Sequence, residues 1–496
     1  MLQSERRFAA ALSNPGEIQQ RLLFNILKHQ RETVFGREHG FSSIQNYGDY
    51  VSRVPIADYE SHQPLIERVR LGEEDVLTAD PVTHLIPTSG SSGPRKLIPH
   101  TVSLQSQFNA ALGPWVRSMF RRFPGATQGR TYWSVSPAID EDAASAVKVG
   151  FEDDTDYLGP LGRMLVRRIL AVPSSVRKIS DIDAFWNATA LHLLAVKDLS
   201  LVSVWHPSFL MRLLDEIDSR WYDLIDQLPR HRARQLSRTT PDAICEIWPR
   251  LSLVSAWADA SAALPFDRMR ERLSGVEAQA KGLLASECWT TFPYEGMYPL
   301  AVTSHVFEFL DEHGRVTLCD ELQLDEVYET VVTTAGGLYR YRTGDKVRVT
   351  GFLKNTPTLQ FIGRDRAASD LCGEKLTESH VSACLSGVYS QTGYRPTDQA
   401  LIPADSSAPT YYILLLTSNQ PPPADFGQLL DDHLGENPHY ALARRLGQLQ
   451  PLQVHWAAKP FRDLGSESHV TLGSIKPSLL VSHEMLSAYT ASKSSL

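Results

Sequence analysis

The chain has few cysteines, and their spacing fits neither a metal site nor a disulfide framework. Its five cysteines are scattered, odd in number and never arranged as C-x-x-C. A structural zinc site or a set of disulfides is therefore not expected, and this usage fits a reducing intracellular compartment. The positions are Cys245, Cys288, Cys319, Cys372 and Cys384.

Long hydrophobic runs and an excess of basic residues are also missing. The most apolar run, YYILLLT at 411–417, is far shorter than the roughly 20 residues of a membrane-spanning helix. The start, MLQSERRFAAALSNPGE, breaks into charge and proline too early for a signal sequence. The formal net charge is −8, with both signs mixed along the chain, which disfavours nucleic acid or an anionic membrane as a partner. We therefore expect a cytoplasmic protein, and its oligomeric state stays open.

The apolar content is high enough for more than one core. Of the 496 residues, 42% are hydrophobic, whereas single cores stop growing near roughly 250–300 residues. Strands alternating with helices before Pro299 indicate an α/β domain with a largely parallel sheet. After Pro299, alternating apolar and polar residues with turns at Gly314 and Gly336-Gly337 indicate antiparallel strands. We predict a large domain over residues 1–366 and a small α/β domain over 367–496.

Individual elements can also be predicted from periodicity and from proline and glycine. Pro207 is well placed to start a helix, and Gly275 to end one. The expected strands are 81–87 and 199–205, and the expected helices are 18–27, 100–123, 207–228 and 264–275. The first strand is thus expected to lead through a glycine-rich loop into a helix.

That loop, within PTSGSSGPRKLIPHT at 87–101, has almost no apolar surface to bury. Gly90 and Gly93 would let backbone N–H groups converge on an anion without interference from Cβ atoms. The neighbouring hydroxyls and Lys96 would add donors and a positive charge. It is not a Walker P-loop, because the G-x-x-x-x-G-K-[ST] spacing is absent. A phosphate cradle and a plain surface loop both remain open.

Two further stretches carry acidic residues. GLYRYRTGDKVRV at 337–349 contains Asp345, whose carboxylate would suit the hydroxyls of a sugar; the alternative is a hairpin with a solvated face. GLLASECWTTFP at 282–293 contains Glu287, which would suit a divalent cation bound with nucleotide phosphates; the alternative is an acid at a helix start.

Basic residues follow toward the C-terminus. FIGRDRAASDLCGEKLTE contains Arg364 and Lys375, and its alternative reading is a charged linker. Lys476 stands alone in the apolar setting of LGSIKPSLL.

In this order, the segments resemble those of adenylate-forming enzymes. More narrowly, the chain resembles the Gretchen Hagen three family of acyl-acid amido synthetases, the plant auxin-conjugating enzymes and their bacterial relatives. The resemblance spans about residues 80–480 and rests on TSGSSGPRKLIPHT, LVSVWHPSF, GLLASE, FEFL, YETVVTTAGGLYRYRTGDKVRVTGF, PTLQFIGR and GEKLTE. It implies a large α/β domain with an antiparallel β subdomain and a smaller, mobile C-terminal lid.

The resemblance also implies a reaction and roles for residues. A carboxylic acid attacks the α-phosphate of ATP, releasing pyrophosphate, and an amine, usually of an amino acid, then displaces AMP. Glu287 would place Mg²⁺, Asp345 would bind the ribose, and Lys375 and Lys476 would approach the reacting groups from the small domain. The remaining nucleotide-binding residues implied are Ser89, Gly90, Ser91, Ser92, Lys96, Ser286 and Arg364.

The acid site and the acceptor are the least determined parts. The family binds the acid near the helix after the phosphate loop, often with an arginine, which implies Arg117 and Trp115 here. Other aromatic residues that could line this site are Tyr132, Trp133, Trp205 and Trp257. The aromatic residue common before the family's glutamate is absent, because Leu283 and Leu284 stand there, and Cys288 replaces the glycine that follows it. A thiol or hydroxyl acceptor, as in coenzyme A or a carrier protein, and a catalytically silent nucleotide-binding protein remain alternatives.

Overall fold

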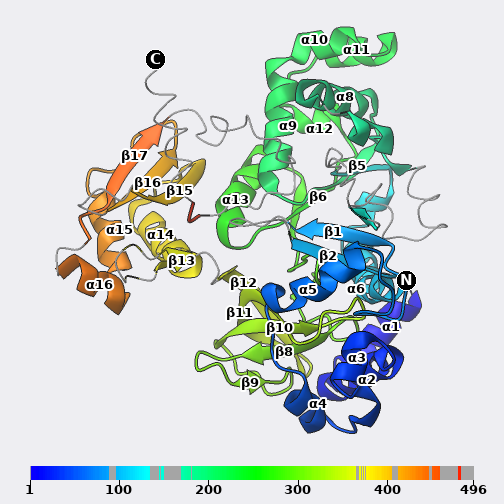
Figure 1. The fold of residues 1–496 in the computed structure, drawn as a ribbon. Coiled ribbons are helices and arrows are strands. Elements are labelled where there is room, and N and C mark those ends of the chain that lie inside the picture. Colours follow the sequence, from blue (N-terminus) through cyan, green and yellow to red (C-terminus); the bar gives the residue numbers. More distant parts are fainter. Residues whose placement is uncertain are drawn as a thin grey trace.

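The computed structural model of the chain has a large lobe and a smaller C-terminal lobe (Figure 1). No helix in the described part is both long and apolar enough to cross a bilayer. The structure describes residues 2–88, 96–134, 145, 147–149, 169–179, 181–364, 368–369, 371, 374, 376–404, 411–445, 449–457 and 479–481.

A four-stranded parallel sheet forms the centre of the upper part of the large lobe. Its order is β3 (Arg130–Trp133), β5 (Leu199–Ser203), β6 (Leu253–Ala256) and β7 (Glu277–Ala280). Leu201 and Leu253 pack into the core that includes α6 (Val102–Arg122). The opposite face packs against α8 (Ile182–Ala195), α9 (Pro207–Ser219) and α13 (Ala263–Arg272). Both faces are therefore covered, as parallel sheets require.

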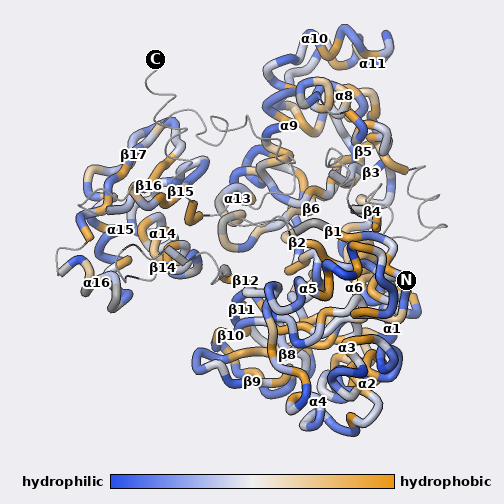
Figure 2. The backbone as a smooth tube through the Cα atoms, viewed as in Figure 1, coloured by the Kyte–Doolittle hydropathy of each residue, from blue (hydrophilic) through white to orange (hydrophobic). Residues whose placement is uncertain are grey.

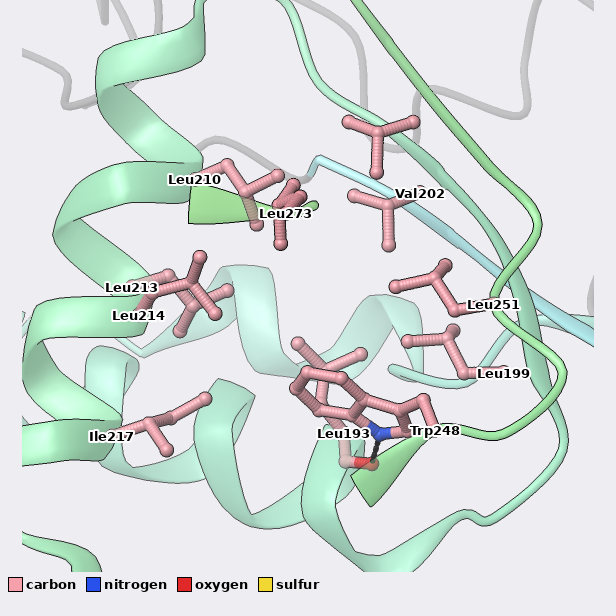
Figure 3. A pocket seen from close by; sticks show the side chains of 11 residues that line it. Leu193, Leu199, Val202, Leu210, Leu213, Leu214, Ile217, Trp248, Leu251 and Leu273 are labelled. Atoms are coloured by element: carbon pink, nitrogen blue, oxygen red, sulfur yellow. Dashed lines mark hydrogen bonds between the residues drawn. The ribbon is translucent and has the colours of Figure 1, made fainter. Parts of the chain in front are cut away.

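The core on the α8, α9 and α13 side contains a small apolar cavity (Figure 3). Its free volume is about 10 Å³, close to the minimum for one water molecule. The only polar side-chain atom among its lining residues, the indole nitrogen of Trp248, donates to the Leu193 carbonyl at 2.9 Å. This cavity is a packing defect rather than a ligand site. Its lining is Leu193, Leu199, Val202, Leu210, Leu213, Leu214, Ile217, Trp248, Leu251, Val254 and Leu273.

The predicted order of strand, loop and helix after residue 80 is wrong, because a second strand lies between the loop and the helix. β1 (His84–Thr88) and β2 (Lys96–His100) form an antiparallel hairpin, with β4 (Lys148–Val149) beside β1. Pro99 disfavours a helix and is tolerated here because β2 is an edge strand. Helix α6 starts only after Thr101, whose hydroxyl accepts from the Leu104 N–H at 3.1 Å. The positive end of α6 therefore does not directly follow the loop.

The strands after Pro299 are antiparallel, as predicted. The order is β12, β11, β10, β8 and β9, and Gly314 and Gly337 adopt φ of 74° and 96° in the connecting turns. This sheet and the parallel sheet together confirm the predicted α/β class. The bounds are β8 (Val306–Leu310), β9 (Val316–Thr317), β10 (Val327–Thr333), β11 (Tyr341–Leu353) and β12 (Thr356–Arg364).

Helices surround the sheets, and Figure 2 shows mostly hydrophilic residues on the outer helix α11, whereas α10 mixes hydrophilic and hydrophobic residues. The predicted helix at 18–27 is confirmed within α2. The predicted start of α9 at Pro207 is also confirmed, but this helix ends at Ser219, and α10 is separate because Arg220 leaves the helical conformation at φ −119° and ψ 22°. The remaining helices are α1 (Leu2–Ala11), α2 (Pro15–Gln30), α3 (Val34–Glu38), α4 (Tyr47–Arg53), α5 (Tyr59–Arg70), α10 (Trp221–Asp226), α11 (Arg230–Leu236) and α12 (Ile244–Ile247).

The small lobe has its own hydrophobic core, which includes Val381, Leu414 and Leu430. One polar contact to the large lobe runs from the Arg268 guanidinium to the Arg395 carbonyl at 2.9 Å. The predicted boundary at 366/367 lies outside the described residues and stays a prediction. The elements are β13 (Ala368–Ser369), β14 (Leu376–Thr377), α14 (Glu378–Thr392), β15 (Asp398–Pro403), β16 (Tyr412–Thr417), α15 (Phe426–Leu434), α16 (Pro438–Arg445) and β17 (Gln453–Ala457).

Candidate active site

Asp345 lies in a bulge of β11. Glu329 of β10 pairs with Lys346, and Val331 pairs with Arg342, so Thr343–Asp345 stand opposite Thr330 alone. Bulges of this kind redirect a side chain, and Gly344 supplies the positive φ of 78° that the bend needs. The bulge is held by the Thr343 hydroxyl, which accepts from the Asp345 N–H at 3.0 Å and contacts the Thr330 hydroxyl at 2.5 Å.

The surroundings of Asp345 are buried rather than solvated. Asp345 is 1% exposed, and Tyr339 and Tyr341 are 0% and 1% exposed. The alternative of a hairpin with a solvated face is therefore wrong for these residues. Asp345 is the cross-strand partner of Arg364 on β12, so the structure brings these two predicted residues together along the backbone.

A buried ion pair between Arg340 and Glu308 stabilises the start of β11. The Arg340 guanidinium contacts both carboxylate oxygens of Glu308 on β8, at 2.8–3.0 Å. Both residues are nearly inaccessible, at 3% and 1% exposure. The Tyr47 hydroxyl donates to the same carboxylate at 2.5 Å, and burial together with this negative charge raises the pKa of Tyr47.

Glu287 lies in a tight turn, not at a helix start. Leu284 and Trp289 form an isolated antiparallel bridge, and the Ala285 N–H donates to the Cys288 carbonyl at 2.9 Å. Ser286 and Glu287 therefore occupy the tip of the turn, with Glu287 8% exposed. The bridge at Leu284 that opens this turn lies four residues after Ala280, the last residue of β7. A single carboxylate suits Mg²⁺, which is usually held by one or two carboxylates plus substrate phosphates.

Lys96 begins β2, at the exit of the glycine-rich loop. Its ammonium lies 5.1 Å from the centre of the Tyr59 ring. The hydroxyl of Tyr59 accepts from the Leu97 N–H at 2.8 Å, so α5 holds this end of the hairpin. The other predicted residues of the loop, Ser89, Gly90, Ser91 and Ser92, lie outside the described residues, as do Lys375 and Lys476.

The side chains of Arg117 and Trp115, both on α6, have different partners. Arg117 is bonded to Glu5 of α1, and Arg121 reaches the same carboxylate at 2.9 Å. The expectation that Arg117 faces the acid's carboxylate is therefore not supported, because a protein carboxylate already holds it. Trp115, only 4% exposed, lies on the inner face of α6, where its indole N–H donates to Gln279 of β7 at 3.4 Å.

Aromatic residues gather where the parallel strands end. Trp133 is the last residue of β3, Trp205 follows β5, and Trp257 follows β6. The ring centres of Trp115 and Trp133 are 6.0 Å apart. Tyr132, also predicted for the acid site, instead packs into the core on the opposite face of the sheet.

The sequence reasoning missed Lys281, which stands among these rings. Its ammonium lies 4.9, 5.9 and 6.0 Å from the ring centres of Trp205, Trp115 and Trp133. Lys281 follows directly after β7, and ligand-binding residues of parallel sheets gather at the carboxyl ends of the strands. This position is the signal that could have identified it. No group of three or more potential metal-ligating side chains occurs among the residues described.

Comparison with solved structures identifies the class of fold. A 2-hydroxyisobutyryl-CoA ligase in the postadenylation state matches with a TM-score of 0.55 at 12% identity, over 98% of this chain and 94% of that one. The AtGH3.15 acyl acid amido synthetase in complex with 2,4-DB matches with a TM-score of 0.84 at 19% identity, over 98% and 95%. The fold is that of adenylate-forming ligases.

Sequence comparison identifies the family. The GH3 family N-terminal domain matches residues 4–235 and the GH3 family central domain matches residues 298–364, together more than half of the chain. The chain belongs to the GH3 family. The indole-3-acetic acid-amido synthetases GH3.4 and GH3.6 of Arabidopsis thaliana are 23% and 24% identical to it, covering 81% and 84% of this chain and 76% and 79% of their own.

Proposed function

We propose that the protein is an ATP-dependent acyl-acid amido synthetase. It activates a carboxylic acid as the acyl-adenylate, with release of pyrophosphate, and transfers the acyl group to an amine, an amino acid in our proposal, with release of AMP. The observation that carries this proposal is family membership together with a fold that matches an acyl acid amido synthetase over nearly the whole chain.

The described residues fit a nucleotide and its metal. We assign the ribose hydroxyls to Asp345, because a bulge near the start of β11 redirects this carboxylate and a rigid sheet holds it. We assign Mg²⁺ to Glu287, and the bound ion would neutralise charge on the phosphates. Lys96, Ser286 and Arg364 would complete the nucleotide site together with Ser89, Gly90, Ser91 and Ser92.

The chemistry needs positioning and charge neutralisation rather than a protein nucleophile. An acid oxygen attacks the α-phosphorus while the bond to pyrophosphate breaks, and the leaving electron pair remains on pyrophosphate. Negative charge develops on the phosphoryl oxygens, where fixed positive groups have their largest effect. Lys375 and Lys476 are proposed for this role in the small domain. The acid itself would lie on the inner face of α6, beside Trp115.

The test measures both half-reactions. Folded protein with Mg²⁺ and ATP should release pyrophosphate when given a suitable acid, and mass spectrometry should find an amide after an amino acid is added. The fold match to a CoA ligase favours one alternative, a thiol acceptor, and a thioester with coenzyme A in place of the amide would support it. Absence of pyrophosphate release across a broad panel of acids, including indole-3-acetate, would contradict both.

A further inference from the structure

Two serines stand side by side near the carboxyl end of the parallel sheet. Ser203 of β5 and Ser255 of β6 are cross-strand partners. The same row continues to Trp133 of β3 on one side and to Gln279 of β7 on the other. These four residues are called the serine row below. In open α/β folds, ligands bind outside this end of the strands.

The serine row faces α6, where the acyl acid is proposed to lie. Its two outer members show this direction. The ring centre of Trp133 is 6.0 Å from that of Trp115 on α6, and the Gln279 side chain accepts from the Trp115 indole N–H at 3.4 Å. Directly paired residues project from the same face of a sheet, so Ser203 and Ser255 also point toward α6.

The two serine hydroxyls are buried and unsatisfied. Ser203 is 2% exposed, Ser255 is 0% exposed, and neither hydroxyl has a hydrogen-bond partner in the part of the chain that the structure describes. Thr131 of β3, one row deeper on the same face, has a third buried hydroxyl without a described partner. Buried polar side chains normally have a partner, and each exception needs a physical reason. A ligand that supplies the missing partner is such a reason.

The spacing of the two serines fits a single ligand oxygen. Neighbouring strands lie about 4.8 Å apart, so the Cβ atoms of directly paired residues have about this separation. Each serine hydroxyl can donate or accept, and one hydroxyl group of a ligand can therefore donate to one serine and accept from the other. Neither serine carries a charge that would compensate a buried carboxylate, so the ligand group is neutral. Trp205, two residues after Ser203, is 39% exposed and marks the side from which a ligand reaches the row.

We propose that Ser203 and Ser255 bind a hydroxyl group on the body of the acyl acid. The substrate class is then a hydroxylated acid, with the hydroxyl remote from the carboxylate that is adenylated. An acid without this group would cover both serines and leave them unpaired, which opposes its binding. This inference rests on the proposed function, because it assigns the specificity of the same site.

The test compares acids that differ by one hydroxyl group. Pyrophosphate release is measured for phenylacetate against its 2-, 3- and 4-hydroxy derivatives, and for octanoate against 8-hydroxyoctanoate. In the wild-type protein, at least one hydroxylated acid should exceed its parent acid in kcat/KM by about 10-fold or more. Ser203→Ala and Ser255→Ala should each lower kcat/KM for that acid about 3- to 10-fold. The value for the parent acid should stay equal or rise, because the hydroxyl that it leaves unpaired is gone.

Ser200→Ala is the matched control, since it makes the same substitution on β5. It removes a hydroxyl that donates to the Ala126 carbonyl at 2.9 Å, so it should lower the Tm and leave the ratio between the two acids unchanged. Without substrate, Ser203→Ala and Ser255→Ala should leave the Tm unchanged or raise it, because the hydroxyls they remove have no partner to lose.

The opposite results would overturn the proposal. They are a wild-type protein that prefers no hydroxylated acid over its parent, or an equal loss for both acids in the two serine variants. A fall in Tm as large as that of Ser200→Ala would show that the hydroxyls already have partners, such as buried water, and would also contradict it. The Tm measurement needs no turnover, so it tests the inference even if no acid releases pyrophosphate, a result that would refute the proposed function.

Discussion

Removal of one partner from the buried Arg340–Glu308 pair should destabilise the large domain strongly. In the Arg340→Met variant, the long apolar stem stays and the guanidinium is lost. Arg340 has a φ of 45°, but methionine has a Cβ as arginine does, so backbone strain is the same in both proteins. The change therefore reports the loss of the charge and its hydrogen bonds.

The size of the effect follows from burial. The Glu308 carboxylate would lose all three contacts to Arg340 and keep the Tyr47 hydroxyl at 2.5 Å. Charge centres about 4 Å apart attract by about 4 kcal/mol at an effective dielectric constant of about 20. Leaving one charge of a buried pair uncompensated costs about 3–5 kcal/mol. We expect a loss of that size in the free energy of unfolding.

Urea unfolding followed by tryptophan fluorescence suits this measurement, because every tryptophan except Trp456 precedes residue 366. Arg348→Met is the matched control, since Arg348 is exposed on β11, the strand that starts directly after Arg340, and should change stability by less than about 0.5 kcal/mol. The double variant of Arg340→Met with Glu308→Gln should be clearly more stable than the sum of the single losses predicts. Additive losses, or a loss in Arg340→Met no larger than in the control, would refute the reasoning.

Three other changes test the site and the core. Asp345→Asn should weaken ATP binding about 10- to 100-fold in calorimetry, because charge-assisted hydrogen bonds worth roughly 1.5–3 kcal/mol are lost. Binding of 2′,3′-dideoxy-ATP, which lacks the ribose hydroxyls, should not change. Unchanged ATP affinity would contradict the ribose assignment. Burial lowers the pKa of His305 to about 3 and that of His100 to about 4, so each contributes stability that is fully present above about pH 6.5 and is lost as pH falls toward the folded value. Each should add about 1.4 kcal/mol per pH unit to the fall in unfolding free energy, and His305→Asn should flatten this slope whereas His313→Asn, at an exposed site, should not. Lys476→Ala should slow adenylate formation and spare amide formation from a supplied acyl-adenylate, and an equal loss in both steps would argue against a step-specific role.

Local signals predicted most of the fold. Period-two alternation after Pro299, the helix start at Pro207 and the turns at Gly314 and Gly337 all depend on neighbouring residues, and the structure agrees with them. The hairpin after residue 80 was missed because the short KLIPH segment had to compete with the strong helical pattern that follows it. Its strand identity comes from pairing with β1, which is a tertiary contact.

Residues of the candidate site could be predicted where they stand in a sequence motif. They could not be predicted where their neighbours come from distant parts of the chain. Asp345 and Glu287 stand in recognisable stretches, although the bulge and the tight turn that hold them were not foreseen. Arg117 looked suitable by position, but its partner Glu5 lies in the first helix, far away in sequence. Lys281 was not identified from the sequence, because the rings of Trp115, Trp133 and Trp205 surround it only in the folded chain.

One contact joins the two sheets on which the proposed sites depend. Trp257, directly after β6, lies 5.5 Å between ring centres from Phe361 of β12. Phe361 pairs with Val347, two residues beyond Asp345, while Lys281 bonds to the residue before Trp257. The proposed ribose site and the proposed acid site are therefore attached to opposite sides of one packed contact. Because reaction rates fall steeply when reacting groups are displaced by about 1 Å, such a short connection would fix the spacing between the two proposed sites.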